Sequence, residues 1–244
     1  MEIVEPRQLQ RPCVVHEGNC ITLQFEDGEI QSRMLASDPS FLVISYTQAM
    51  TAFTLFHATP QSVIMIGLGG GSLAKWCYAE LHSTDITVVE INPMVIALRE
   101  AFSIPEDNHR FRVICGDGAD YVRHLADSPD VLLVDGFDRH GQPAQLSSQA
   151  FYDDCCRFLS RNGLLVVNLC GPEDQQALER IRQTFEDRLL IVVPEDGENK
   201  IVFAWKGKQR WIDEGDSESI KRSLAGFMLV PFSIAEYGQA AAAK

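Results

Sequence analysis

Acidic residues follow three apolar segments of the chain, at the points where buried strands would end. Glu90 closes "DITVVE", Asp117 follows "FRVIC", and Asp135 and Asp138 follow "VLLV". Carboxylates at strand ends can accept hydrogen bonds from ribose hydroxyls or adenine amino groups, and they can bind ammonium groups. The alternative for Asp135 and Asp138 is an aspartate-rich turn that bonds to its own backbone, and for Asp117 it is a helix cap.

A glycine-rich loop precedes these acids. "SVIMI" runs into Gly67, Gly69 and Gly70, and a helical pattern follows. Glycines between a strand and a helix let the backbone approach a ligand closely, although a tight turn would use them too. The dinucleotide fingerprint GxGxxG is incomplete because its third position is Ser72, which disfavours an NAD-dependent oxidoreductase. Together with Glu90 at the next strand end, the loop predicts a ligand that contains adenosine.

The elements that position these residues alternate between strand and helix. Long apolar runs without alternation indicate strands buried on both faces, and the 3.6-residue spacing between them indicates helices. We therefore predict a doubly wound, mostly parallel α/β sheet of the Rossmann-like type found in S-adenosylmethionine-dependent methyltransferases, closed by an antiparallel pair. A short β-meander should precede it, so we place a small N-terminal β segment at residues 1–45 and the catalytic domain at 46–244. The predicted strands cover 13–18, 20–28, 29–35, 62–68, 85–92, 111–118, 130–137, 164–170 and 188–206, and the predicted helices cover 46–58, 71–83, 93–102, 119–127, 147–163 and 172–185.

Composition excludes several classes of function. The 244 residues carry a net charge of −13, which disfavours nucleic acid as a partner and suits a cationic ligand. No apolar run reaches the ~18 residues that span a bilayer, and no signal-peptide pattern begins the chain, so we expect a cytoplasmic protein without membrane contact. The seven cysteines lack metal-ligand spacing, so we expect no metal.

Taken in chain order, these segments resemble the spermidine synthase family, the polyamine aminopropyltransferases. "DGEIQ" resembles the family's N-terminal hairpin, whose glutamine contacts the ligand and is Gln31 here. "SYTQAM" resembles a helix start that carries a substrate-side tyrosine, Tyr46. "VVEIN" and "GDGADYV" resemble the ribose and adenine strands, with Glu90, Asp117 and Gly118 in register. "DGFD" and the following "GQPAQLSSQAFY" resemble the family's DxxD motif and the loop after it.

The resemblance implies transfer of an aminopropyl group from decarboxylated S-adenosylmethionine, the co-substrate, to a di- or polyamine. Putrescine converted to spermidine is one example, with methylthioadenosine released. Such an amine is protonated at neutral pH, with a pKa of about 10.4, so a carboxylate should accept its proton. We assign that catalytic role to Asp135, and we assign substrate binding to Asp138 and Tyr46. Gln31, Gly67, Gly69, Gly70, Glu90, Asp117 and Gly118 should bind the donor. The resemblance also implies a homodimer, and the loop after Asp138 should act as a lid.

One difference from the family pattern leaves the identity of the donor open. Family members commonly have an aspartate inside the glycine loop that holds the donor's ammonium group, and the matching residue here is Gly70. Intact S-adenosylmethionine carries a carboxylate that such an aspartate would repel. An S-adenosylmethionine-dependent methyltransferase is therefore the main alternative, and a non-catalytic nucleoside- or polyamine-binding relative is another. The N-terminal β segment is also shorter than in the family.

Overall fold

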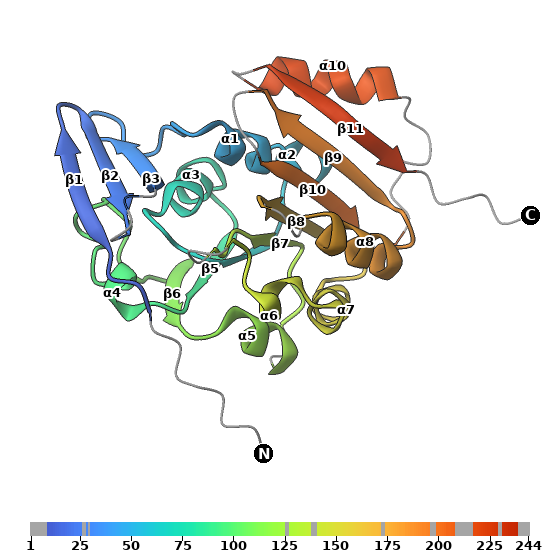
Figure 1. Cartoon of the computed structure of the whole chain (residues 1–244), viewed down its shortest axis with the longest axis horizontal. Helices are drawn as coiled ribbons and strands as arrows, with labels where there is room; N and C mark the ends of the chain where they lie inside the picture. The colour runs from blue at the N-terminus through green and yellow to red at the C-terminus, as the bar shows by residue number, and fades with distance from the viewer. Residues whose placement is uncertain are drawn as a thin grey trace, which may run out of the picture.

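The protein consists of a three-stranded sheet and an eight-stranded sheet with helices on both faces (Figure 1). The computed structural model describes residues 9–25, 28, 30–124, 127–137, 141–171, 174–195, 199–207, 217–228 and 231–238. Within these ranges no helix is long and apolar enough to cross a membrane. The predicted doubly wound α/β class with an N-terminal β-meander is confirmed.

The N-terminal sheet is an antiparallel meander of β1 (Cys13–Glu17), β2 (Cys20–Gln24) and β3 (Ile30–Leu35). The register of β3 against β2 shifts near Gln31, because Leu23 pairs with Ser32 while Gln24 pairs with Ile30. One extra residue on a strand is a β-bulge, which bends the strand and re-aims its side chains. Leu23 and Met34 are buried in the same hydrophobic core as the larger sheet, so the meander packs directly onto it.

The large sheet has the strand order β11-β9-β10-β8-β7-β4-β5-β6. Its parallel part consists of β4 (Ser62–Ile66), β5 (Asp85–Glu90), β6 (Phe111–Cys115), β7 (Val131–Val134) and β8 (Leu164–Leu169). Every residue of β7 and β8 is buried, which explains their unbroken apolar sequences. The chain runs outward from β4 through β5 to β6 and then returns to β7 on the other side of β4. Ligands bind at such a switch in strand order.

Three further strands extend the sheet beyond β8. β9 (Leu189–Pro194) and β10 (Lys200–Trp205) form the expected antiparallel pair, and β10 lies between β8 and β9. β11 (Phe232–Gly238) pairs with β9 and forms the edge.

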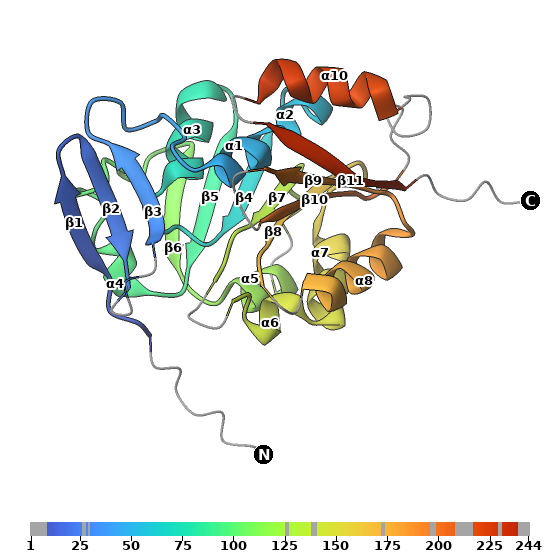
Figure 2. The ribbon, with the colours of Figure 1, turned by 45° about the horizontal axis from the view of Figure 1, so that its top comes forward.

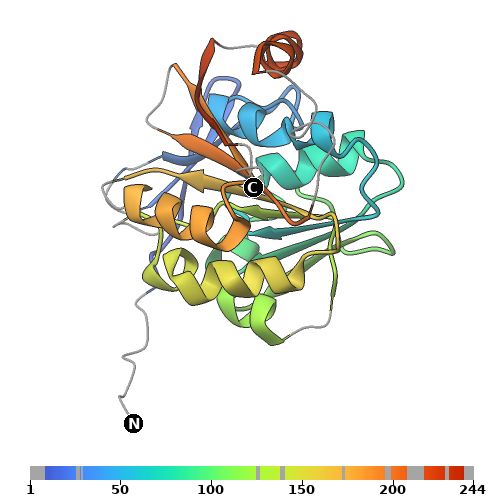
Figure 3. The same ribbon diagram turned by 90° about the vertical axis from the view of Figure 1, so that its right-hand side faces the viewer.

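Helices cover both faces of the sheet (Figures 2 and 3). One core contains apolar residues of α1 (Ser45–Thr51), α2 (Phe53–Phe56), α3 (Ser72–Glu80), α4 (Pro93–Ile96) and α10 (Ser217–Phe227). The other core contains residues of α5 (Gly118–His124), α6 (Ala144–Ser147), α7 (Gln149–Phe158) and α8 (Asp174–Phe185). Each layer therefore buries its apolar stripe against one face of the sheet.

Three details differ from the sequence predictions. The helix predicted over 46–58 breaks at Ala52 into α1 and α2. The helix predicted over 93–102 is a single helical turn, α4, because the chain continues as turns that bring Phe102 fully into the core. We did not predict α10 and β11, although Ile220, Leu224 and Met228 recur at helical spacing and are buried.

Candidate active site

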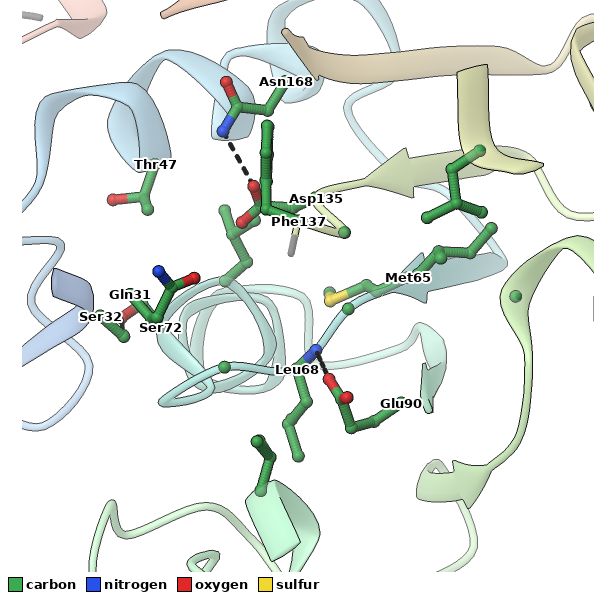
Figure 4. A pocket seen from close by; sticks show the side chains of 18 of the residues that line it. Gln31, Ser32, Thr47, Met65, Leu68, Ser72, Glu90, Asp135, Phe137 and Asn168 are labelled. Carbon is green, nitrogen blue, oxygen red and sulfur yellow. Dashed lines mark hydrogen bonds between the residues drawn. The ribbon is translucent and has the colours of Figure 1, made fainter. Parts of the chain in front are cut away.

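A cavity of about 670 Å³ opens at the carboxyl ends of the parallel strands, beside β3 and α1 (Figure 4). Among the described residues that line it, every side chain of the charged types is an acid: Glu90, Asp117 and Asp135. The other lining residues used below are Gln31, Ser32, Tyr46, Gly67, Gly69, Ser72, Gly118, Asn168, Cys170 and Asn199. Three carboxyl groups and no basic side chain among the described lining residues favour a cationic ligand.

The glycine loop approaches the β7 strand end very closely. Gly67 has φ +98°, and a Cβ placed on it would lie 2.2 Å from the backbone oxygen of Asp135. The Gly67 N–H donates to the carbonyl oxygen of Val89 at 2.9 Å, which ties the loop to β5 as well. Only glycine allows both the conformation and the approach. The loop therefore brings the ends of β4, β5 and β7 around one space.

Glu90 anchors the glycine loop from the end of β5. Its Oε2 accepts from the backbone N–H of Leu68 at 2.8 Å, and its Oε1 accepts from that of Asn92 at 2.8 Å. Burial raises the pKa of Glu90, and the backbone N–H groups around the carboxylate act in the opposite direction. Glu90 thus organises the loop in addition to lining the cavity.

Asp117 caps α5 and also lines the cavity. Its Oδ1 accepts from the backbone N–H of Ala119 at 2.8 Å, as expected for a residue that caps α5. Asp117 and Gly118 also line the cavity. A Cβ on Gly118 would lie 2.3 Å from Cγ2 of Ile66, so glycine is needed where α5 starts beside β4. Capping and contact with a ligand are compatible here.

Asp135 is held by two neutral donors. The Tyr46 hydroxyl donates to its Oδ2 at 3.2 Å. The Asn168 amide donates to its Oδ1 at 2.9 Å, as Figure 4 shows. Burial raises the pKa of Asp135, and the bonds from Asn168 and Tyr46 partly offset that rise. Burial, followed by the neighbouring Asp135, also raises the pKa of Tyr46. The carboxylate is therefore oriented and is more basic than an ordinary aspartate.

The meander covers the other side of the loop. Because of the bulge in β3, the consecutive residues Gln31 and Ser32 both line the cavity. The hydroxyl oxygens of Ser32 and Ser72 lie 3.2 Å apart. Gly70 does not line the cavity: a Cβ on it would lie 2.6 Å from Oγ of Ser32 and 2.9 Å from Cδ1 of Phe102. The space beside position 70 is thus filled by β3.

Most of the residues that we singled out from the sequence meet in this cavity. They are Gln31, Tyr46, Gly67, Gly69, Glu90, Asp117, Gly118 and Asp135. Gly70 lies beside the cavity. Asp138 and the first two residues of the expected lid, 139 and 140, fall outside the described residues, while Gly141, Pro143 and Leu146 of the same loop line the cavity. Sequence reasoning missed Asn168 and Asn199, which the structure places in the wall. A polar residue inside the apolar run "LLVVNLC" was a usable signal for Asn168.

Comparison with known proteins identifies the family. The Spermine/spermidine synthase domain matches residues 43–216. This chain belongs to the spermine/spermidine synthase family. Curated relatives named polyamine aminopropyltransferase include one from Neisseria meningitidis serogroup A, 38% identical over 87% of this chain and 83% of its own length. Another, from Chromobacterium violaceum, is 37% identical over 79% of this chain and 75% of its own length.

Solved structures share the fold of this family member. A probable spermidine synthase from Corynebacterium glutamicum ATCC 13032 matches with a TM-score of 0.76 at 18% identity, over 93% of this chain and 87% of that chain. A human methyltransferase-like protein 13 in complex with SAH matches with a TM-score of 0.64 at 21% identity, over 75% of this chain and 90% of that chain. The fold is therefore common to transferases of both kinds, and the reaction must be argued from the site.

Proposed function

We propose that this protein is a polyamine aminopropyltransferase that transfers the aminopropyl group of decarboxylated S-adenosylmethionine to a di- or polyamine. The observation that carries the proposal is Asp135, a carboxylate of raised pKa held by neutral donors in a cavity whose described charged residues are all acids. The polyamine aminopropyltransferases at 37–38% identity support the same reaction. The three acids and the lack of a basic side chain among the described lining residues suit a sulfonium donor and an ammonium acceptor.

The reaction on this site is a single displacement. The acceptor arrives as an ammonium ion, and Asp135 takes its proton to expose the nitrogen lone pair. That lone pair attacks the methylene carbon next to the sulfonium, the new N–C bond forms, and the C–S bond breaks with its electron pair left on sulfur. Methylthioadenosine and the lengthened amine leave, and Asp135 returns its proton to solvent. The Tyr46 hydroxyl, which donates to Asp135, keeps the carboxylate aimed at the amine.

The proposed contacts to the parts of the donor follow the order of the strands in the sheet. Asp117 at β6 suits the adenine amino group, Glu90 at β5 suits the ribose, and the glycine loop at β4 lies between Glu90 and Asp135. A donor whose adenosyl group is bound in this order would have its sulfonium sulfur over the glycine loop, within reach of an amine at Asp135. Gln31 supports the donor from the meander, and Asp138 is proposed to hold a second ammonium group of the acceptor.

Three broader features also belong to the proposal. We expect a homodimer, as the family resemblance suggests, and a cytoplasmic location, as expected from the lack of a signal-peptide pattern. We place the division between the β segment and the catalytic domain at residue 45. The net charge of −13 supports small cationic substrates, with neither nucleic acid nor a membrane as a partner.

A methyltransferase is the second candidate, and the surroundings of Gly70 favour it. Ser32 and Ser72, both neutral, form the cavity wall beside this loop, so no described acid there would repel the carboxylate of intact S-adenosylmethionine. The shared fold with a human methyltransferase-like protein is compatible with both reactions.

Calorimetry with three ligands separates the candidates. If aminopropyl transfer is the reaction, decarboxylated S-adenosylmethionine is expected to bind at least about tenfold more tightly than S-adenosylmethionine, because the extra carboxylate would enter the cavity of Asp135 with no described basic side chain to pair with it. Methylthioadenosine, which lacks the transferred group, measures the adenosine contacts alone. A clear preference for the carboxylated donor would reject aminopropyl transfer.

The catalytic assignment has its own test. Asp135→Asn is expected to lower turnover with a diamine by about 100-fold or more, because the base is lost, and to leave methylthioadenosine affinity within about twofold. A parallel loss of binding and turnover would mean that Asp135 supports the structure rather than the reaction.

A further inference from the structure

Three polar side chains form a directed chain of hydrogen bonds at the end of the cavity. Asn199 donates through Nδ2 to Oδ1 of Asn168 at 3.0 Å, and Asn168 donates through Nδ2 to Oδ1 of Asp135 at 2.9 Å. Asn168 is only 2% exposed, within a strand whose six residues are all buried. A buried amide is retained in such a strand when both of its ends are bonded, as they are here.

The sheet builds this chain from three neighbouring strands. β7 and β8 run parallel with Val134 opposite Val167, so the next residues, Asp135 and Asn168, emerge side by side. β10 runs antiparallel to β8 with Ile201 opposite Asn168, which brings Asn199 to the same end. Asp135 and Asn199 each lie one residue outside their strands, so their positions follow from the register of β7, β8 and β10.

The direction of the chain is determined by the carboxylate. If the Asn168 amide were flipped, its carbonyl oxygen would face Oδ1 of Asp135, and two acceptors would meet without a proton between them. Asn199 supports this orientation by donating through Nδ2 to the carbonyl oxygen of Asn168. Every donor in the chain therefore points toward Asp135.

A neutral donor is the suitable partner for a base. A lysine or arginine beside Asp135 would hold the carboxylate but would also lower its pKa by about 1–3 and remove its basicity. The amide of Asn168 orients one oxygen without adding charge, while Tyr46 and an incoming amine can share the other.

We propose that Asn168 is a positioning residue for the base Asp135, and that Asn199 keeps the Asn168 amide in its donating orientation. The inference rests on the proposed function, in which Asp135 accepts the proton of the acceptor amine. Asn168 stabilises the ionised carboxylate of Asp135 through Oδ1 before the reaction. Oδ2 of Asp135 then stays available to the attacking nitrogen.

The test is the pH dependence of turnover with a diamine, measured for Asn168→Ala, Asn168→Gln and Asn199→Ala. Loss of the donor makes ionised Asp135 less stable, so the acid limb for Asn168→Ala should move up by about one pH unit. Turnover should fall by up to about tenfold at pH values below the wild-type acid limb and should recover at higher pH. Asn168→Gln, which keeps an amide donor, should restore most of the wild-type profile, and Asn199→Ala should shift it in the same direction by less.

A second readout keeps the inference testable without activity. The titration of the Asp135 carboxyl carbon, followed by NMR and assigned with Asp135→Asn, should move up in Asn168→Ala even in the free protein. Asn108→Ala is the matched control, since Asn108 is exposed and remote from the cavity, and it should leave the titration unchanged.

The outcomes separate this inference from the proposed function. If the wild type transfers no aminopropyl group, the proposed function fails, and the NMR titration alone then decides whether Asn168 acts on Asp135. An unchanged titration in Asn168→Ala overturns the inference. A uniform loss of turnover at every pH, together with weaker methylthioadenosine binding, also overturns it, because that pattern marks a purely structural residue.

Discussion

Asp135 is half-buried and Lys75 is buried, and the two differ in the partners that stabilise their charge. Asp135 has two side-chain donors, Tyr46 and Asn168, that stabilise its charge. Lys75 is 4% exposed and donates to the carbonyl oxygen of Phe102 and to Sδ of Met34, and among the described residues no carboxylate pairs with it. Burial lowers the pKa of Lys75 to about 8. The Asp135 carboxylate, held by two donors, fits a chemical role. The buried ammonium group of Lys75 instead lowers the stability of the folded state.

Lys75→Met should therefore stabilise the protein at neutral pH. Below pH 8 the folded state must bury the charged ammonium, which costs about 3 kcal/mol relative to an unperturbed lysine. The unfolded chain holds the proton up to about pH 10.4, so this penalty disappears as the pH rises from 8 to 10.4. The gain in melting temperature for Lys75→Met should be largest at pH 7 and should shrink by pH 10. The exposed Lys221→Met serves as the control and should show no such trend.

At the scale of elements, the active site depends on how closely strand ends approach one another. The glycine loop after β4 contacts the end of β7, and the bulge in β3 presents two consecutive side chains to the same cavity. Neither feature belongs to a single element. Both features arise where the backbones of two elements lie against each other. Substitutions at these positions should therefore weaken ligand binding as well as lower the free energy of unfolding.

Gly67→Ala tests this dependence. The new Cβ would meet the Asp135 carbonyl oxygen at 2.2 Å, and φ +98° is strained for alanine, so the free energy of unfolding should fall by about 2 kcal/mol or more. Methylthioadenosine should also bind more weakly, because the loop must move. Gly18→Ala is the matched control: its φ is +60° with nothing within 4 Å, so it should cost about 1 kcal/mol and leave binding unchanged. Urea unfolding and calorimetry measure both quantities. Equal behaviour of the two variants would contradict the role given to the loop.

At the scale of the whole molecule, α10 and β11 complete the fold outside the matched family domain. The domain match ends at residue 216, and α10 begins at Ser217. Ile220, Leu224 and Met228 join the core that also contains the meander, α1 and α3. This segment therefore supports the scaffold at a distance from the cavity, whose described lining residues end at Asn199.

Leu224→Ala should separate stability from activity. Removing a fully buried leucine should lower the free energy of unfolding by about 2–5 kcal/mol. KM for donor and acceptor should stay at the wild-type values at temperatures where the variant is folded. The exposed Lys221→Ala, on the same helix, should change stability by no more than about 0.5 kcal/mol. A raised KM in Leu224→Ala would show that α10 influences the site.

Local patterns were enough to predict much of this protein. Unbroken apolar runs indicate the buried strands, and acids just after them indicate a ligand site, because parallel strands end at one edge of a sheet. Glu90, Asp117 and Asp135 were found in this way and all line the cavity. The family resemblance added Tyr46 and Gln31. The role of Asp138 and the domain division at residue 45 stay predictions.

The sequence by itself thus determined the order of the elements and the strand ends that carry acids, because burial and turn formation depend on neighbours in the chain. Only the tertiary structure decided which groups meet. Tyr46 lies 89 residues from Asp135 and Asn168 lies 33 residues from it. Strand order places Asn168 beside Asp135, and the packing of α1 on the sheet brings Tyr46 to them. Gly70 faces β3 and not the cavity because of the way the meander packs on the loop. Contacts between distant segments follow from packing, which no local pattern encodes.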